Sequence, residues 1–321
     1  MRNAIVIAAL AVVGLCAQGQ QDSAPPSSNV RQSLDDAWWT GPMLAPSAAT
    51  LPRGHFLIEP YLYDVRSAHL NGFGSLTYMN YGLADRVTVG MIPTAGFNAV
   101  SKGASSSGVG MGDLSLQAQY RLTKFQAGRW IPTTSISVQE TFPTGKYDRL
   151  GARKSDGLGA GAYATTLAFY TQTYFWLPNG RILRTRFNVS QAFPNSVDVK
   201  DGSVYGTEAG FRGQAKPGKS LFVNAAWEYS LTRRWVLALD ATYRRGGSTR
   251  VSGYNILVPD GAGNPTSIRL DSGSSDTVGF APAIEYSWKS TIGVLIGARV
   301  IAIGHNTPVS ITPAVALNFV H

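Results

Sequence analysis

Arginine and carboxylate side chains recur at the polar positions of several alternating segments, and their spacing is the feature of this chain that could do chemistry. Arg184 and Arg186 are separated by one residue, and Glu228 stands at a polar position of a later segment. Guanidinium and carboxylate groups on one surface either pair with each other or bind a polar solute along a hydrated path. The elements that hold these side chains decide which of the two applies.

Residues of the usual catalytic and metal-binding types are scarce. The chain has four histidines and a single cysteine, Cys16. A hydrolytic site needs a histidine base within hydrogen-bond reach of a nucleophile. Neither His69 nor His305 lies in a sequence that resembles the HxSNG run of outer-membrane phospholipases. We therefore expect that the chain is not an enzyme and that it has no catalytic residue, no cofactor and no metal site.

The segments around the charged residues alternate between apolar and polar side chains, which is typical of strands with one face toward lipid and one toward water. In residues 113–122 every partner of the apolar row is polar, and in residues 220–230 only Phe222 and Ala226 interrupt the polar row. The pattern is clear at 113–122, 183–190, 220–230, 235–244 and 277–288, and weaker at roughly 54–65, 75–83, 86–98, 132–143, 160–177, 291–304 and 308–320.

The connections between these twelve expected strands alternate in length. Tight turns are expected at 83–86, 178–180, 232–234 and 288–290, whereas long polar connections cover roughly 98–111, 143–160, 194–218 and 246–275. Short turns at one end and long loops at the other are typical of bacterial outer-membrane barrels. The sequence therefore predicts an all-β fold, a transmembrane up-and-down antiparallel β-barrel of about twelve strands and of the outer-membrane type.

The composition favours this fold over other classes. Charged residues make up 15% of the 321 residues, compared with about 25% in an ordinary soluble domain. Past the first twenty residues no apolar run reaches the roughly 18 residues of a spanning helix, which excludes a helical membrane protein. The net charge is +9, but the basic residues are scattered. We therefore expect no nucleic acid as partner, and expect outer-membrane lipid and lipopolysaccharide instead.

The N-terminal part of the chain predicts export and a leader. A basic start, an apolar stretch at 4–15 and small residues at 17 and 19 indicate a signal peptide over residues 1–19, and its cleavage would remove Cys16. Residues 20–52 are rich in Pro, Ser, Gln and Ala and form a periplasmic leader or partial plug; residues 53–321 form the barrel. Trp38 and Trp39 are the plug candidates, docked either in the periplasmic mouth or at the membrane interface.

The inward parity of the strands assigns a set of polar and aromatic side chains to the lumen. Its five arginines and four carboxylates make a nearly balanced wall, with Glu228 as the candidate partner of Arg184 and Arg186. Such a wall either lines a solute path or pairs internally and keeps the interior hydrated. The lumen-lining candidates are Arg121, Arg184, Arg186, Arg244, Arg299, Asp113, Glu228, Asp240, Glu285, Gln117, Gln119, Asn188, Asn224, Tyr61 and Tyr63.

Several stretches resemble a known family. The sequences WTGPMLAP at 39–46, LPRGHF at 51–56, EPY at 59–61, QETFPTGKY at 139–147, DGLG at 156–159 and EYSLTRRW at 228–235 are similar to recurring segments of the MetA-pathway (meta-pathway) phenol-degradation family of outer-membrane transporter-like proteins. The resemblance spans most of residues 38–321. It implies a barrel in the outer membrane and a link to the uptake of aromatic compounds.

Two hypotheses for the function follow. The first is a monomeric barrel in the outer membrane of a Gram-negative bacterium that passes small, hydrophobic or aromatic molecules passively across the membrane; the sequence does not identify the solute. A barrel of twelve strands is narrower than an open porin, so any channel should be narrow. The second is a non-conducting structural or binding barrel with a plugged lumen.

Overall fold

The computed structural model describes residues 31–68, 70–259 and 261–321. The predicted signal peptide and the start of the leader lie outside the described residues. The elements are η1 (Leu34–Asp36), η2 (Lys154–Asp156) and the strands β1 (Phe56–Ser67), β2 (Leu70–Ala84), β3 (Val87–Ile92), β4 (Thr94–Val100), β5 (Gly110–Met111), β6 (Leu114–Thr123), β7 (Thr133–Phe142), β8 (Ala164–Trp176), β9 (Ile182–Pro194), β10 (Val197–Lys200), β11 (Phe211–Lys216), β12 (Ser220–Ser230), β13 (Trp235–Gly246), β14 (Arg250–Pro259), β15 (Pro265–Asp271), β16 (Ser275–Lys289), β17 (Ile292–His305) and β18 (Ser310–Val320).

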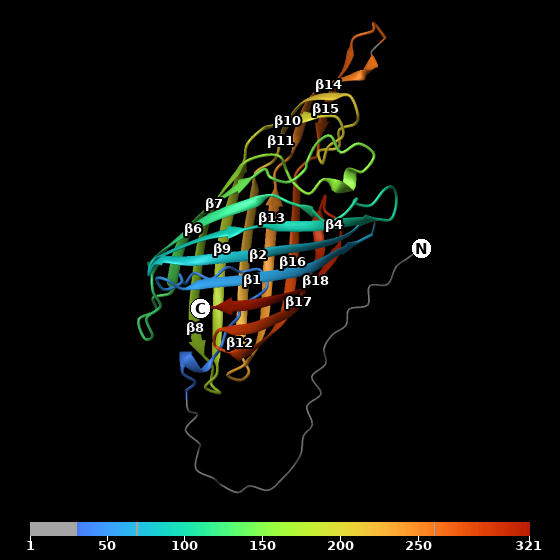
Figure 1. Ribbon diagram of the computed structural model, residues 1–321. Coiled ribbons are helices and arrows are strands. Elements are labelled where there is room, and N and C mark those ends of the chain that lie inside the picture. Colours follow the sequence, from blue (N-terminus) through green and yellow to red (C-terminus); the bar gives the residue numbers. More distant parts are fainter. Residues whose placement is uncertain (1–30, 69, 260) are drawn as a thin grey trace, which may run out of the picture. The chain divides into compact units, whose positions relative to one another are not determined.

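The main sheet closes on itself into a barrel (Figure 1). Its order is β1-β18-β17-β16-β13-β12-β9-β8-β7-β6-β3-β2, and β2 also pairs with β1. Pro93 divides one barrel strand into β3 and β4, and residues 112–113 divide the next into β5 and β6. Counted this way, the barrel has the twelve antiparallel strands that the sequence predicts, each next to its neighbours in the chain.

Within the described ranges, no helix is long and apolar enough to cross a bilayer.

The alternation of residues explains which face of each strand is inside. In β13, Trp235, Leu237 and Leu239 are 41–44% exposed, whereas Val236 and Asp240 are fully buried. The exposed row is apolar, as expected of side chains that face lipid. Aromatic rings gather at one end of this outer face, where Trp235 lies 4.5 Å from Tyr286 and Tyr286 lies 5.4 Å from Trp288 between ring centroids. Rings of this kind mark the membrane interface, so the chain is an outer-membrane barrel.

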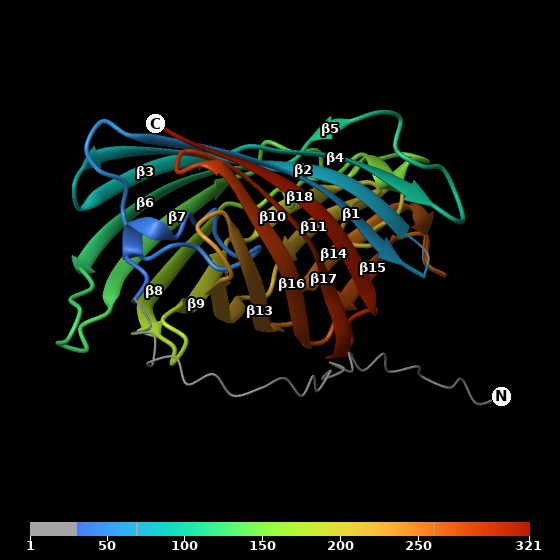
Figure 2. The same ribbon diagram turned by 90° about the horizontal axis from the view of Figure 1, so that it is seen from below.

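The two ends of the barrel differ. The connections at 85–86, 177–181, 231–234 and 290–291 are short and lie at the end where β1 begins and β18 ends, seen from below in Figure 2. This is the periplasmic end, because outer-membrane barrels carry their short turns there. The opposite, outer end carries the long connections.

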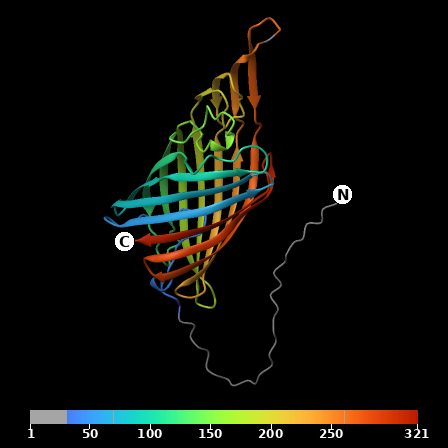
Figure 3. The same ribbon diagram turned by 45° about the vertical axis from the view of Figure 1, so that its right-hand side comes forward.

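Two of the long connections are not irregular loops but a second sheet, with the order β10-β11-β14-β15. These strands continue β9, β12, β13 and β16 beyond the rim in an unbroken register, since Ser220 pairs with Gly246 and, four residues farther out, Lys216 pairs with Arg250. Figure 3 shows them as the yellow and orange strands above the barrel. One face packs around a small apolar core of Val199, Phe211, Ala215 and Val251.

Candidate functional site

Residues 31–52, called the lumen segment below, run inside the ring of strands from the periplasmic end (blue in Figure 2). The segment enters beside two periplasmic turns, where the N–H of Gln32 donates to Gly180 O (3.0 Å) and the N–H of Trp38 donates to Arg233 O (2.9 Å). It returns to the same end, where Thr50 Oγ1 donates to Asp85 O (2.7 Å). The middle of the segment therefore crosses the lumen and folds back.

Two buried carboxylates of the wall hold the backbone of the segment. Glu285 Oε2 accepts from the N–H and the hydroxyl of Thr40 (2.8 and 2.9 Å) and from the N–H of Gly41 (3.1 Å). Asp240 accepts from the N–H of Leu44 (3.2 Å) and from the Asn224 amide (3.0 Å). A carboxylate needs several donors when it is removed from water, and here the chain's own backbone supplies them.

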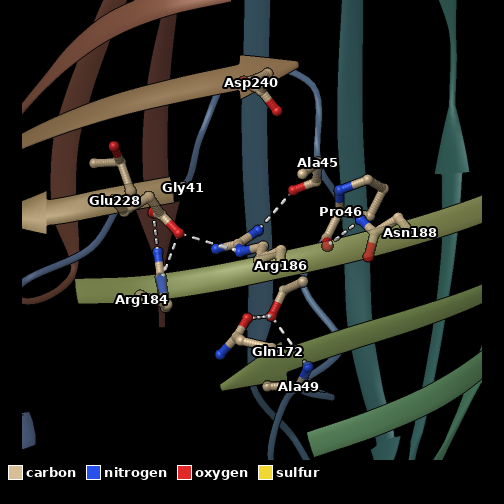
Figure 4. A network of polar contacts seen from close by, with 12 residues as sticks. Gly41, Ala45, Pro46, Ala49, Gln172, Arg184, Arg186, Asn188, Glu228 and Asp240 are labelled. Carbon is tan, nitrogen blue, oxygen red and sulfur yellow. Dashed lines mark hydrogen bonds and ion pairs between the residues drawn. The ribbon is translucent and has the colours of Figure 1, made fainter. Parts of the chain in front are cut away.

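One of the paired arginines, Arg186, binds a carbonyl group of the segment, and the other, Arg184, binds Glu228 (Figure 4). Arg184 binds Glu228 through two hydrogen bonds, one of them 2.6 Å from Nε to Oε2. Arg186 donates from Nη1 to Ala45 O (2.7 Å), and its Nε lies 3.2 Å from Glu228 Oε2, close enough for an ion pair but without hydrogen-bond geometry. All three side chains are buried, so the two arginines share one carboxylate inside the wall.

Uncharged side chains of the wall complete this attachment. Asn188 donates to Pro46 O (2.9 Å), and Gln119 donates to Ser47 O (2.9 Å). The hydroxyl of Ser47 donates to Gln172 Oε1 (3.1 Å). The segment thus contacts side chains from β6, β8, β9, β13 and β16, which are far apart in the sequence.

Trp38 and Trp39 occupy different depths. Trp38 lies beneath Arg233, 4.7 Å from its guanidinium, at the periplasmic turn between β12 and β13. Trp39 lies farther in, 4.4 Å from the guanidinium of Arg184 and 6.5 Å from the ring of Tyr174. Arg184 is therefore enclosed by a carboxylate and an aromatic face, both of which favour a positive charge.

Met43 anchors an apolar cluster inside the barrel, against the neighbouring strands β1, β18, β17 and β16. It packs with buried Tyr61, Ala281, Leu295 and Ala316. Gly297 makes room for it, because a Cβ at that position would come within 2.6 Å of Met43 Cε. On this side of the barrel, the lumen is thus filled by side chains of the segment and of the wall.

Two cavities within the described part of the lumen lie beside this filled region. The inner cavity, about 250 Å³, lies between the segment and β1, β2, β3 and β6. The outer cavity, about 320 Å³, lies toward the long connections and is bounded by β7, β8, β9, β12 and β13. The same four residues, Leu44, Pro46, Tyr78 and Tyr170, line both cavities. We call these four residues the throat. The lumen on the side of the inner cavity is called the inner lumen, and the lumen on the side of the outer cavity is called the outer lumen.

The structure separates the nine charged candidates. Only Arg184, Arg186 and Glu228 are brought together as an ion-paired group, and Asp240 and Glu285 bind the segment instead. Asp113 precedes β6 at the outer end, where it accepts from the N–H groups of Gly145 (3.0 Å) and Ala160 (2.7 Å).

The remaining candidates lie elsewhere in the wall. Arg121 lies near the periplasmic end of β6, opposite Ser135. Gln117 donates to Asn80 (2.8 Å), and the ring of Tyr63 covers Gly74. Arg244 and Arg299 lie on β13 and β17.

Sequence reasoning missed several wall residues. Glu59 on β1 accepts from Asn318 on β18 (3.3 Å), and Gln172, Tyr78 and Tyr170 contact the segment or line the throat. The signal that could have found them is inward parity in the weaker strands, because Glu59 shares its parity with Tyr61 and Tyr63.

The outer connections are tied together by further carboxylates. Asp156 accepts from the N–H of Ser107 (2.7 Å), and this hydrogen bond lowers the pKa of Asp156 below its usual value. Lys154 pairs with Glu208 in the same group of connections. These contacts join the connections that follow β4, β7 and β10.

Comparison with known proteins gives a family and a fold. Residues 41–300 match the model of the family described as "Putative MetA-pathway of phenol degradation". An outer-membrane channel from Pseudomonas putida F1 is 16% identical, with a TM-score of 0.64 over 87% of this chain and 100% of that chain. No curated protein matches the sequence.

Two further solved barrels align less well. The translocator domain of the autotransporter NalP from Neisseria meningitidis is 13% identical, with a TM-score of 0.39 over 83% of this chain and 87% of that one. The toluene transporter TbuX from Ralstonia pickettii is 11% identical, with a TM-score of 0.34 over 87% and 93% of the two chains.

Proposed function

The chain belongs to the family described as "Putative MetA-pathway of phenol degradation", and we propose that it is a channel. It would be monomeric and would pass small hydrophobic or aromatic molecules passively across the outer membrane. The observation that carries the proposal is the throat. A path between the two cavities passes Leu44, Pro46, Tyr78 and Tyr170, which offer apolar and aromatic surface. A narrow constriction of this kind admits an apolar body more readily than a hydrated ion.

The lumen segment is the element that sets the width of this path. Leu44 and Pro46 belong to the segment, whereas Tyr78 and Tyr170 belong to the wall. The segment would act as a partial plug: its hydrogen bonds to Glu285, Asp240, Arg186 and Asn188 hold the narrow path at a fixed width. Passage of a solute would then need only small movements of the throat side chains.

Uptake of N-phenyl-1-naphthylamine, a fluorescent aromatic probe, by porin-deficient Gram-negative cells tests this proposal. Expression of the protein should raise the rate of probe uptake several-fold and leave the uptake of a hydrophilic sugar unchanged. Pro46→Trp should abolish the gain because it fills the throat. Pro282→Trp is the matched control, since Pro282 is exposed on the outer face of β16. Equal uptake with and without the protein would overturn the proposal.

A second candidate is a non-conducting barrel whose lumen is permanently plugged. The observation that favours it is the number of strands that bind the segment, from β6 to β16. The same assay separates the two candidates, because a folded barrel that does not raise the uptake of the probe supports the second.

A further inference from the structure

Two arginines on the outer side of the throat have no carboxylate partner. Arg244 of β13 donates to the Ser220 hydroxyl (3.2 Å) and lies over the ring of Phe222 at 4.9 Å. Arg299 of β17 has a buried Nε without a hydrogen-bond partner. Among the described residues, no carboxylate oxygen lies within 4.0 Å of either guanidinium, in contrast to Arg184 and Arg186.

The two arginines face the same part of the lumen. Strands β13 and β17 both pair with β16, so only one strand separates them. Arg244 pairs with Thr277 of β16, and Arg299 lies opposite Ala281, four residues along the same strand. The inward residues of β16 over this stretch, Thr277, Gly279 and Ala281, are small, which leaves space between the two long side chains. Two like charges held near each other without a counter-charge favour binding of an anion.

The outer cavity, which Arg244 lines, also offers surface for an aromatic ring. Arg244 lines the cavity together with Phe222, Tyr78 and Tyr170, and Ser190 and Gln139 add hydrogen-bonding groups. Phe222 is the inward apolar residue that interrupts the polar row of its strand, and its ring supports the Arg244 guanidinium. The cavity thus combines a cationic end with aromatic walls, which matches a small molecule with a ring and a carboxylate.

We propose that Arg244 and Arg299 bind the carboxylate of a small aromatic acid in the outer lumen, with its ring against Phe222 and the throat. The proposal rests on the proposed channel function and names the class of solute that the outer lumen selects. A guanidinium recognises a carboxylate by charge-assisted hydrogen bonds. Neutral aromatic molecules would share the path but would lack this contact.

Equilibrium dialysis of the purified full-length mature protein in detergent tests the site, with benzoate, benzyl alcohol and benzylamine as probes. The variant Arg244→Gln/Arg299→Gln removes both guanidinium groups. Arg245→Gln is the matched control, since Arg245 is the next residue of β13, exposed and of opposite parity. The heat-dependent gel mobility of the barrel establishes that each variant is folded, and the two single variants replace the double variant if it does not fold.

The wild-type protein should bind benzoate at least about tenfold more tightly than benzyl alcohol or benzylamine, because hydrogen bonds to a charged group contribute on that order. The double variant should lose this preference and retain its affinity for benzyl alcohol, and Arg245→Gln should behave as the wild type. Equal binding of benzoate and benzyl alcohol to the wild type overturns the proposal, as does an equal loss in Arg245→Gln.

Inorganic phosphate serves as a competitor. If phosphate displaces benzoate at equal concentration, the site recognises a bare anion, and the assignment to aromatic acids is wrong. The uptake of N-phenyl-1-naphthylamine stays independent of both arginines. If cells that express the wild-type protein take up the probe no faster than cells without it, the channel function is contradicted. If the wild-type protein shows no preference for benzoate, only the binding site is contradicted.

Discussion

In the inner lumen the arginines form ion pairs with a carboxylate, whereas two arginines of the outer lumen have no carboxylate partner in the described part of the chain. In the inner lumen, Glu228 forms ion pairs with both Arg184 and Arg186, and Glu285 binds the backbone of the lumen segment. In the outer lumen, the guanidinium of Arg244 contacts the Ser220 hydroxyl and the ring of Phe222, and no carboxylate of the described residues forms an ion pair with it. A paired buried charge serves attachment, because an opposite charge already lies beside it. An unpaired one remains available to a ligand.

The two lumens also differ in what fills them. The segment occupies the inner side and brings backbone N–H and C=O groups to the wall, which the wall side chains satisfy. Of the residues of the segment, Leu44 and Pro46 alone line the outer cavity. One ring of twelve strands can thus combine an inner lumen that the segment fills with an outer lumen that is open to a ligand, because the segment occupies only the inner side.

Deleting residues 39–48 should produce the largest effect. The two cavities would join, and single-channel conductance in planar bilayers should rise several-fold because the throat loses Leu44 and Pro46. Deleting residues 31–36, which removes η1 but keeps the crossing part, is the control and should leave the conductance close to that of the wild type. Unchanged conductance in the first deletion would mean that ions do not pass where the segment lies.

Glu228→Gln should cause the largest loss of stability from a single substitution. It leaves two buried guanidinium groups without their shared carboxylate, and breaking a buried pair costs about 3–5 kcal/mol in the free energy of unfolding. Urea unfolding followed by gel mobility measures the change. Glu208→Gln removes an acid from the exposed pair with Lys154 and should change stability little. Equal losses in both variants would show that the burial of Glu228 has no energetic consequence.

Two double variants compare the arginine pairs directly. Arg184→Gln/Arg186→Gln should lower the unfolding temperature and leave ion selectivity unchanged, because these residues hold Glu228 and Ala45 O. Arg244→Gln/Arg299→Gln should shift the reversal potential toward cations with little loss of stability, because lumen charges without partners tune selectivity. If both double variants lower the unfolding temperature, or if both shift the reversal potential, the proposed difference between the two arginine pairs is contradicted.

Trp39→Ala and Trp38→Ala should have the smallest effects of this series. The ring of Trp39 contributes a cation–π contact to Arg184, and its removal should lower the free energy of unfolding by about 1 kcal/mol. Trp38→Ala should lower it less, because its partner Arg233 has a side chain that is 58% exposed. A larger loss for Trp38 than for Trp39 would indicate that the periplasmic turn, not the inner lumen, anchors the segment.

The sequence by itself determined the barrel and the direction of its side chains. Strand position, strand number and the two kinds of connection follow from a period of two and from turn residues, which are local properties. The inward parity of Arg184, Glu228 and Asp240 follows from the same alternation. Even the pairing of Arg184 with Glu228 was accessible, because the two residues lie on strands that follow each other in the chain and face each other in register.

Only the tertiary structure decided what each inward charge meets. Glu285 binds Thr40 across 245 residues of sequence, and Arg186 binds Ala45 across 141. The path of the lumen segment has no period, so no local pattern reveals which wall residue it reaches. The same holds for the second sheet, where polar connections form strands because the register of the barrel continues through them. Alternation fixes the face on which a side chain lies, but its partner depends on how distant parts of the chain fill the closed lumen.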